Sequence, residues 1–166
     1  RMFAHSADAT AEIVHAAGAS GLPLWVKLSP NTPDLVEIAG AALAAGAEAL
    51  VLVNTVLGLS IDVETRRPAL GARGGGLSGP GILPVALRAV YDVHAAFANA
   101  PLVGVGGVSR GRDALALVMA GASAVEVGTA SFADPRAPWR IAREVEEWMR
   151  HRGVQTVSEL VGAAHD

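Results

Sequence analysis

The sequence predicts an α/β fold built on a parallel sheet. Short apolar runs rich in leucine and valine alternate along the chain with longer stretches whose apolar residues recur at helical spacing. The short runs are apolar at nearly every position, which is typical of strands covered by helices. A strand followed by a helix, repeated several times, gives parallel strands joined by helical crossovers.

Four strands are expected from these runs. They are LPLWVKLS (22–29), EALVLVN (48–54), APLVGVG (100–106) and SAVEVG (123–128). Glycine or polar residues stand at the carboxyl end of every run. The stretch between the second and third strands holds the glycine-rich segment GGLSGPG (75–81), which we expect to be a loop.

Helices are expected before, between and after the strands. Their ranges are 7–17, 33–45, 82–97, 110–120, 135–150 and 156–164, the last one short. Ser6 is the expected N-cap of the first helix. Thr32 is the expected N-cap of the second, with Pro33 in the first turn, where its missing N–H costs nothing. Gly121 suits the end of the fourth helix.

Two architectures fit this order of elements: an open doubly wound sheet and a (β/α)₈ TIM barrel. A barrel takes about 250 residues and eight strands, whereas this chain has 166 residues and four expected strands. The chain opens on a helix and begins with Arg1 rather than methionine. If the fold is a barrel, residues 1–166 are therefore expected to be the C-terminal half of one domain, supplying about the last four strands and their helices.

Composition excludes several classes of protein. The net charge of −3 provides no basic surface for nucleic acid or an anionic membrane. The chain has no cysteine, and therefore no disulfide, cysteine-based zinc site or iron–sulfur cluster of its own. No run is apolar over the length of a membrane span, and no signal peptide is recognisable, so a cytoplasmic location is expected. The five histidines show no paired ligand spacing, so no metal site is expected.

The strand ends hold the candidate site. In both architectures ligands bind where the carboxyl ends of parallel strands meet. The polar and glycine residues at these ends are Lys27, Ser29, Asn31, Asn54, Thr55, Gly104, Gly106, Gly107, Gly128, Thr129 and Ser131. Their recurrence after every strand predicts one binding site at this edge of the sheet.

The last two strand ends resemble phosphate-binding loops. In barrels a phosphate commonly binds in the loops after strands seven and eight. The segments GVGGVSRG (104–111) and VGTASFADP (127–135) suit this pattern, with N–H groups from Gly106, Gly107, Gly128 and Thr129. Two ordinary turns are the alternative. A dinucleotide-binding motif is disfavoured because Ser109 stands where its third glycine belongs.

Three other features allow a functional and a structural interpretation. The glycine-rich segment 75–81 allows a phosphate or an aromatic cofactor to approach the backbone closely. The alternative is that it only forms a turn. Lys27 stands near the end of an apolar strand. Its ammonium either meets an anion in a pocket or extends to the solvent at the rim of the barrel. Asn54 can orient a planar ligand or cap its strand. Glu126 alternates with valines and faces the interior of a barrel, with no function assigned; the three tryptophans are expected to be packing residues.

Taken together, VKLSPN (26–31), VNT (53–55), GGLSGPG (75–81), VGVGGV (103–108) and AGASAVEVGTASFADP (120–135) closely resemble one family. The resemblance is to the C-terminal half of dihydroorotate dehydrogenase, and DVETRRPAL (62–70) favours its NAD-linked heteromeric class 1B. It covers essentially the whole chain. It implies an FMN-containing TIM barrel that oxidises dihydroorotate to orotate in pyrimidine biosynthesis.

The resemblance also implies a role for each candidate residue. Lys27 would stabilise negative charge on the flavin, Val53 would contact FMN through its backbone, and Gly79 would allow the flavin to approach closely. Asn54 and Thr55 would hold orotate. Gly106, Gly107, Gly128 and Thr129 would bind the FMN phosphate.

The family's catalytic base lies upstream of the helix that opens this chain, so the fragment alone is expected to be inactive and to need the missing half. The resemblance further implies an oligomer, and a partner subunit with FAD and a [2Fe–2S] cluster that reduces NAD. The alternatives are another FMN barrel oxidoreductase, a non-redox barrel enzyme that binds a phosphate, and a non-catalytic half barrel.

Overall fold

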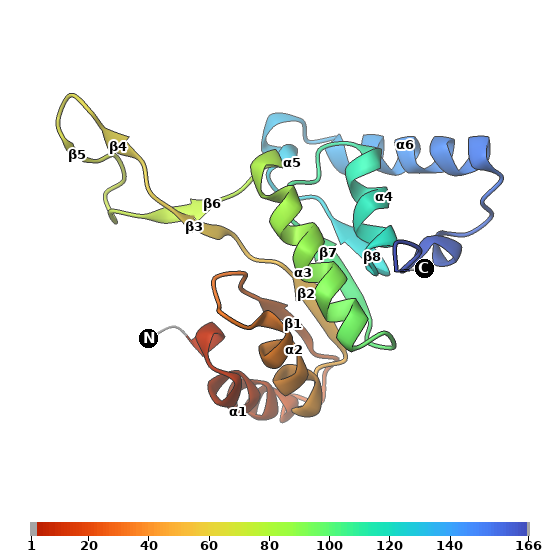
Figure 1. Ribbon diagram of the computed structural model, residues 1–166, viewed down its shortest axis with the longest axis horizontal. Coiled ribbons are helices and arrows are strands. Elements are labelled where there is room, and N and C mark those ends of the chain that lie inside the picture. Colours follow the sequence, from red (N-terminus) through yellow and green to blue (C-terminus); the bar gives the residue numbers. More distant parts are fainter. Residues whose placement is uncertain (1–2, 166) are drawn as a thin grey trace.

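A four-stranded parallel sheet forms the centre of the computed structural model, which describes residues 3–165 (Figure 1). Its strands are β1 (Trp25–Leu28), β2 (Ala49–Leu52), β7 (Leu102–Val105) and β8 (Ala124–Glu126). They lie side by side in that order, each parallel to its neighbour. All four strands expected from the sequence are therefore confirmed, with shorter bounds.

Five longer helices match the expected ranges. They are α1 (Ala7–Gly18), α2 (Leu35–Ala44), α3 (Leu83–Ala96), α4 (Gly111–Met119) and α6 (Ala137–Arg152). The remaining helical elements are α5 (Ala130–Ala133) and the 3₁₀ turns Phe3–His5, Pro80–Ile82 and Val157–Leu160. The last of these replaces the short α-helix expected over 156–164.

One expected helix cap is confirmed and one is wrong. The Ser6 side chain accepts a hydrogen bond from the Ala9 N–H at 3.4 Å and so caps α1. At α2 the cap is Asp34 rather than Thr32, because the Asp34 carboxylate accepts from the Glu37 N–H at 2.9 Å. Asp34 has an extended backbone, so Pro33 precedes the helix instead of occupying its first turn.

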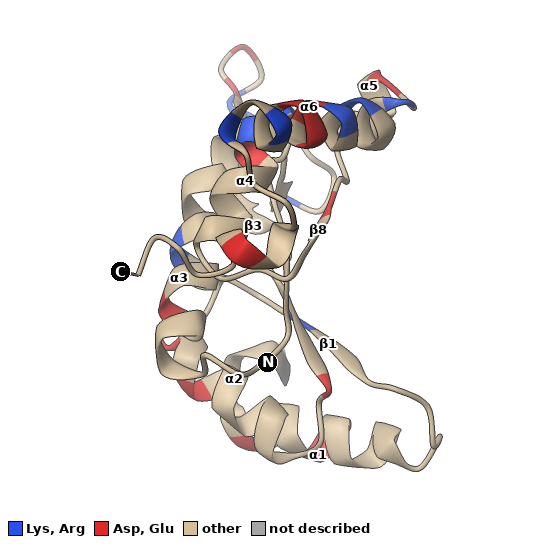
Figure 2. Cartoon of the chain, turned by 90° about the vertical axis from the view of Figure 1, so that its right-hand side faces the viewer, with Lys and Arg blue, Asp and Glu red and all other residues tan. Residues whose placement is uncertain are grey.

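Helices cover one face of the sheet. Leu28, Leu50, Leu52 and Leu102 are almost fully buried and share one apolar core with residues of α2, α3 and α4. Figure 2 shows these helices on the same side of the strands. A doubly wound sheet carries helices on both faces and changes direction in its strand order. Sequential order with helices on one face is the arrangement within a barrel wall, as expected from the sequence.

The opposite face of the sheet is concave and more open. Val51, Val103 and Val105 form a small apolar cluster there. Trp25 is 62% exposed on the outer strand β1, and Trp139 of α6 is 67% exposed. The expectation that both would be packing residues is wrong for this chain, whereas Trp148 packs against buried residues of α4. Trp25 lacks a covering layer because no described helix lies over this face.

The segment expected to be a loop between β2 and α3 forms an arm that projects from the sheet (Figure 1). In it β3 (Val56–Gly58) pairs with β6 (Gly75–Leu77), and β4 (Ile61–Asp62) pairs with β5 (Arg67–Pro68), both antiparallel. A side chain at Gly76 would collide with Thr55, and a Cβ at Gly75 would lie 2.9 Å from Leu70 Cδ1. These two glycines therefore serve the packing of the arm.

The position of the α2 cap can be tested by a matched pair of substitutions. Asp34→Ala is expected to lower the free energy of unfolding by about 1 kcal/mol because it removes the cap. Thr32→Ala should change it by less than about 0.5 kcal/mol. Urea unfolding of both variants checks this, and a larger loss in Thr32→Ala would show that the cap lies at Thr32 after all.

Candidate functional site

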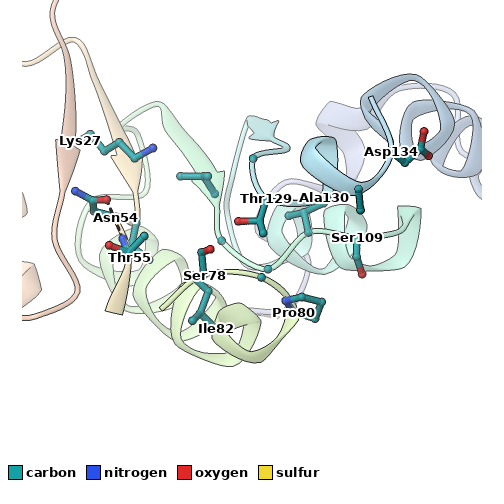
Figure 3. Close-up of a pocket in the computed structure, with 18 of the residues that line it drawn as sticks. Lys27, Asn54, Thr55, Ser78, Pro80, Ile82, Ser109, Thr129, Ala130 and Asp134 are labelled. Carbon is teal, nitrogen blue, oxygen red and sulfur yellow. Dashed lines mark hydrogen bonds between the residues drawn. The ribbon is translucent and has the colours of Figure 1, made fainter. Parts of the chain in front are cut away.

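One cavity of about 470 Å³ opens at the carboxyl edge of the sheet (Figure 3). It is lined from six segments: the end of β1, the residues after β2, the turn before α3, the loop after β7, the segment after β8 that includes α5, and the first turn of α6. The candidate residues that line it are Lys27, Val53, Asn54, Thr55, Gly79, Gly106, Gly107, Gly128 and Thr129. The structure thus brings together every residue assigned to cofactor or substrate by resemblance.

Backbone N–H groups at one end of the cavity are free to bind an anion. Those of Gly107 and Val108 after β7, and of Gly128 and Thr129 after β8, have no acceptor within residues 3–165. Val108 is buried, where a backbone donor normally has a partner, whereas Gly107 is half-buried and Gly128 and Thr129 are exposed. Successive unpaired N–H groups in a turn form an anion-binding concavity. This end of the cavity therefore suits a phosphate.

Glycine occurs in each of these two loops for a different structural reason. Gly107 has a φ of +77°, and a Cβ there would lie 2.6 Å from the backbone nitrogen of Leu83 at the start of α3. Only glycine allows that close approach. A Cβ at Gly128 would meet no atom within 4 Å, so at this position the bare backbone leaves the cavity open.

Carboxylates hold the first loop from outside the cavity. Asp113 accepts hydrogen bonds from the Ser109 N–H (2.9 Å), the Ser109 hydroxyl (2.8 Å) and the Arg110 N–H (3.1 Å). The next N–H, that of Gly111, donates to Glu144 of α6. The donors after Val108 are therefore already engaged, and the free donors are confined to the side that faces the cavity.

Arg140 connects this loop to α5 and α6. Its guanidinium donates to the Ser109 carbonyl at 3.2 Å, to Asp134 at 3.3 Å and to Glu144 at 2.8 Å. The Gly111 N–H, and secondly Arg140, lower the pKa of Glu144 below its usual range. Arg140 and Asp134 also line the cavity, and neither was singled out in the sequence, because the contact of Arg140 with the Ser109 carbonyl joins segments that no local pattern connects.

Lys27 and the start of the arm form the other end of the cavity, and Figure 3 shows Lys27, Asn54 and Thr55 close together. The Asn54 Oδ1 accepts from the Thr55 N–H at 2.8 Å. Asn31 donates to the Thr55 carbonyl at 2.9 Å and accepts from the Leu57 N–H at 2.8 Å. Asn31 thereby fixes the base of the arm, a positioning role that its place after a strand did not reveal.

Gly79 lies where the arm returns to the cavity. Its φ is +85°, in the region that favours glycine, and Pro80 begins the 3₁₀ turn that leads into α3. A Cβ on Gly79 would lie 3.8 Å from Thr129 Cγ2, so the two loops contact each other across the cavity wall. Of the glycines in 75–81, Gly79 is the one that lines the cavity, and its neighbours Ser78 and Pro80 line it as well.

Comparison with known proteins decides the family. The family model described as dihydroorotate dehydrogenase matches residues 1–149. The chain belongs to the dihydroorotate dehydrogenase family. This agrees with the resemblance drawn from the sequence motifs.

Relatives in this family are similar over most of the chain. The chain is 55% identical to the dihydroorotate dehydrogenase B (NAD⁺) catalytic subunit of Geobacter sp. (strain M21), over 85% of its length and 46% of the relative's. It is 50% identical to the putative dihydroorotate dehydrogenase A (fumarate) of Solibacter usitatus, over 96% of this chain and 53% of the relative. The chain thus spans about half the length of the curated relatives it matches.

A solved structure supports the fold. DHODH from Eimeria tenella in complex with ferulenol superposes with a TM-score of 0.80 at 26% identity, covering 97% of this chain and 49% of that one. Together with the strand order, this shows that the chain supplies part of a TIM barrel. Between residues 3 and 165, no helix combines the length and apolar character needed to cross a membrane.

The support of the first loop by Glu144 predicts pH-dependent stability. Because folding lowers the pKa of Glu144, its contribution is complete above the unfolded pKa and is lost as the pH falls through the folded pKa. Glu144→Gln should cost about 1 kcal/mol at pH 7, a modest value because the side chain is 38% exposed. In unfolding experiments from pH 7 to pH 3, the difference in the free energy of unfolding between the variant and the parent should become smaller below about pH 4.5. A difference independent of pH would contradict this role.

Proposed function

We propose that the complete protein binds FMN in this cavity and oxidises dihydroorotate to orotate. One observation carries the proposal: free backbone donors for an anion lie at one end of the cavity and a lysine lies at the other. FMN has the same polarity, with a phosphate at one end and, at the other, a flavin ring that gains electrons on reduction. A cavity of about 470 Å³ is also of the size that cofactors occupy.

The residues present fit this cofactor. Gly106, Gly107, Gly128 and Thr129 would bind the phosphate through backbone N–H groups, with the Thr129 hydroxyl as a further donor. Val53 and Gly79 would lie against the flavin through their backbones. Lys27 would place a fixed positive charge where negative charge develops.

Substrate binding is assigned to Asn54 and Thr55. Asn54 offers an amide and Thr55 a hydroxyl, which together can match the donors and acceptors of a pyrimidine ring and its carboxylate. Asn31 holds Thr55 by its carbonyl, so the hydroxyl is presented from a fixed backbone. Bound FMN would supply the hydride chemistry, and these side chains would supply orientation.

The catalytic base is expected outside this chain. The matched relatives are about twice as long, and the outer edges of β1 and β8 have no partner strand among residues 3–165. Unpaired sheet edges favour association with further strands. We therefore assign the base and the remaining strands to the other half of the barrel, and we expect the 166-residue chain alone to be inactive.

The electron acceptor is proposed to be NAD, reached through a partner subunit that carries FAD and a [2Fe–2S] cluster. Several relatives are named as the catalytic subunit of an NAD⁺ enzyme, which supports a heteromeric complex. The Solibacter relative is named for fumarate instead. Fumarate is therefore the second candidate acceptor, and steady-state assays with NAD⁺ and fumarate distinguish the two.

The first test is the visible absorbance spectrum of the protein expressed from its complete reading frame. We expect a flavin spectrum that dihydroorotate bleaches under anaerobic conditions. If flavin is bound but stays oxidised after dihydroorotate is added, the substrate assignment is wrong and the assignment of the FMN site still stands. A colourless protein that does not take up added FMN would reject the cofactor and favour a non-redox barrel.

Lys27→Ala tests the charge at the flavin end. The rate of flavin reduction by dihydroorotate, measured by stopped flow, should fall about 10²-fold because one electrostatic stabiliser is lost. The affinity for FMN should fall by less than about tenfold, since the phosphate loops lie at the other end. An unchanged reduction rate would exclude Lys27 from the mechanism.

A further inference from the structure

Lysine occurs once in this sequence, among 13 basic residues, and that lysine is Lys27 in the cavity. Its ammonium lies 3.6 Å from the Glu126 carboxylate, and each side chain is 45% exposed. This separation is an ion pair rather than a hydrogen bond. No other carboxylate within the described residues forms an ion pair with Lys27.

The pair joins the two outermost strands of the sheet. Lys27 is in β1 and Glu126 is in β8, with β2 and β7 between them. Four flat strands would place the outer two about 14 Å apart, so contact requires both a curved sheet and two long side chains. The register places Lys27 level with Val51, and Glu126 level with Val105. Both charged side chains therefore project from the concave face.

The surface beneath the pair is apolar. Val51, Val103 and Val105 form a cluster between the two outer strands and offer no hydrogen-bonding side chain to the ammonium. Lys27 itself makes no hydrogen bond to the described residues, so Glu126 is what fixes the direction of its long, flexible side chain. Lys27 lines the cavity whereas Glu126 does not, so Glu126 can act on a bound ligand mainly through Lys27.

We propose that Glu126 is a positioning residue that holds Lys27 over the inner face and offsets its charge, and so sets the reduction potential of the bound flavin. This inference rests on the proposed FMN site and adds a residue to it. With Glu126 present, the flavin end of the cavity experiences less than a full positive charge. Removing the carboxylate increases the net positive charge there and favours the electron-rich reduced flavin.

Redox titration of the full-length protein tests this inference. Glu126→Gln keeps the shape of the side chain and removes its charge. It is expected to shift the relative affinity for reduced over oxidised FMN three- to tenfold in favour of the reduced form. A tenfold shift corresponds to about 30 mV more positive for a two-electron couple. Glu126→Asp keeps the charge on a shorter side chain. Its flavin reduction potential should lie between that of the parent and that of Glu126→Gln.

Two comparisons separate this role from other effects. Glu147→Gln removes an exposed carboxylate of α6 and should leave the potential unchanged, which controls for net charge. In a Lys27→Gln background, Glu126→Gln should shift the potential clearly less than it does when Lys27 is present, since coupled residues give a non-additive cycle. Melting temperatures of the apoproteins show whether each variant is folded.

The possible outcomes are distinct. A potential that is unchanged or more negative in folded, flavin-loaded Glu126→Gln overturns the inference and leaves the FMN site intact. A full shift that persists without Lys27 also overturns it, because Glu126 would then act directly. Failure of the parent protein to bind flavin overturns the proposed function, and this inference with it.

Discussion

Burial of one face of the sheet is the constraint on which the rest of the structure depends. Leucines of the strands pack against α2, α3 and α4 on that face, and this fixes the strands in sequential order and parallel direction. Parallel strands place all their carboxyl ends at one edge. Residues as distant in sequence as Lys27 and Thr129 consequently share one cavity. The site is thus a consequence of the core rather than a separate feature.

The loops that line the cavity are ordered from the outside. Asp113 and Glu144 engage the N–H groups of Ser109 to Gly111, while Arg140 holds the Ser109 carbonyl. Binding an anion with backbone donors works best when these donors are already in place, because ordering a loop on binding costs conformational entropy. Charged residues behind the loop, such as Asp113 and Glu144, can therefore affect how tightly an anion would be held. Helix α6 contributes both in this indirect way, through Glu144, and directly, through Arg140 in the cavity wall.

The sequence predicts what depends on local pattern. Strands and helices followed from apolar spacing, and the glycines and polar residues at strand ends followed from parallel topology. The arm over 56–77 was missed because strands of two or three residues in a glycine-rich, charged stretch leave no periodic signal. Asp34 and Thr32 are both good caps, and the choice between them depended on where the helix packs. The contacts of Gly76 with Thr55 and of Lys27 with Glu126 join segments whose approach no local pattern records.

The open concave face gives the missing half of the barrel an electrostatic role as well as a structural one. In this chain Lys27 and Glu126 are each 45% exposed, so water screens their interaction. Further strands that close the barrel would cover the face and lower the local dielectric constant, which strengthens interactions between charges. The same closure makes an unpaired ammonium more costly to bury than a paired one. If the barrel is closed in this way, the ion pair with Glu126 of β8 would lower the cost of burying the Lys27 ammonium.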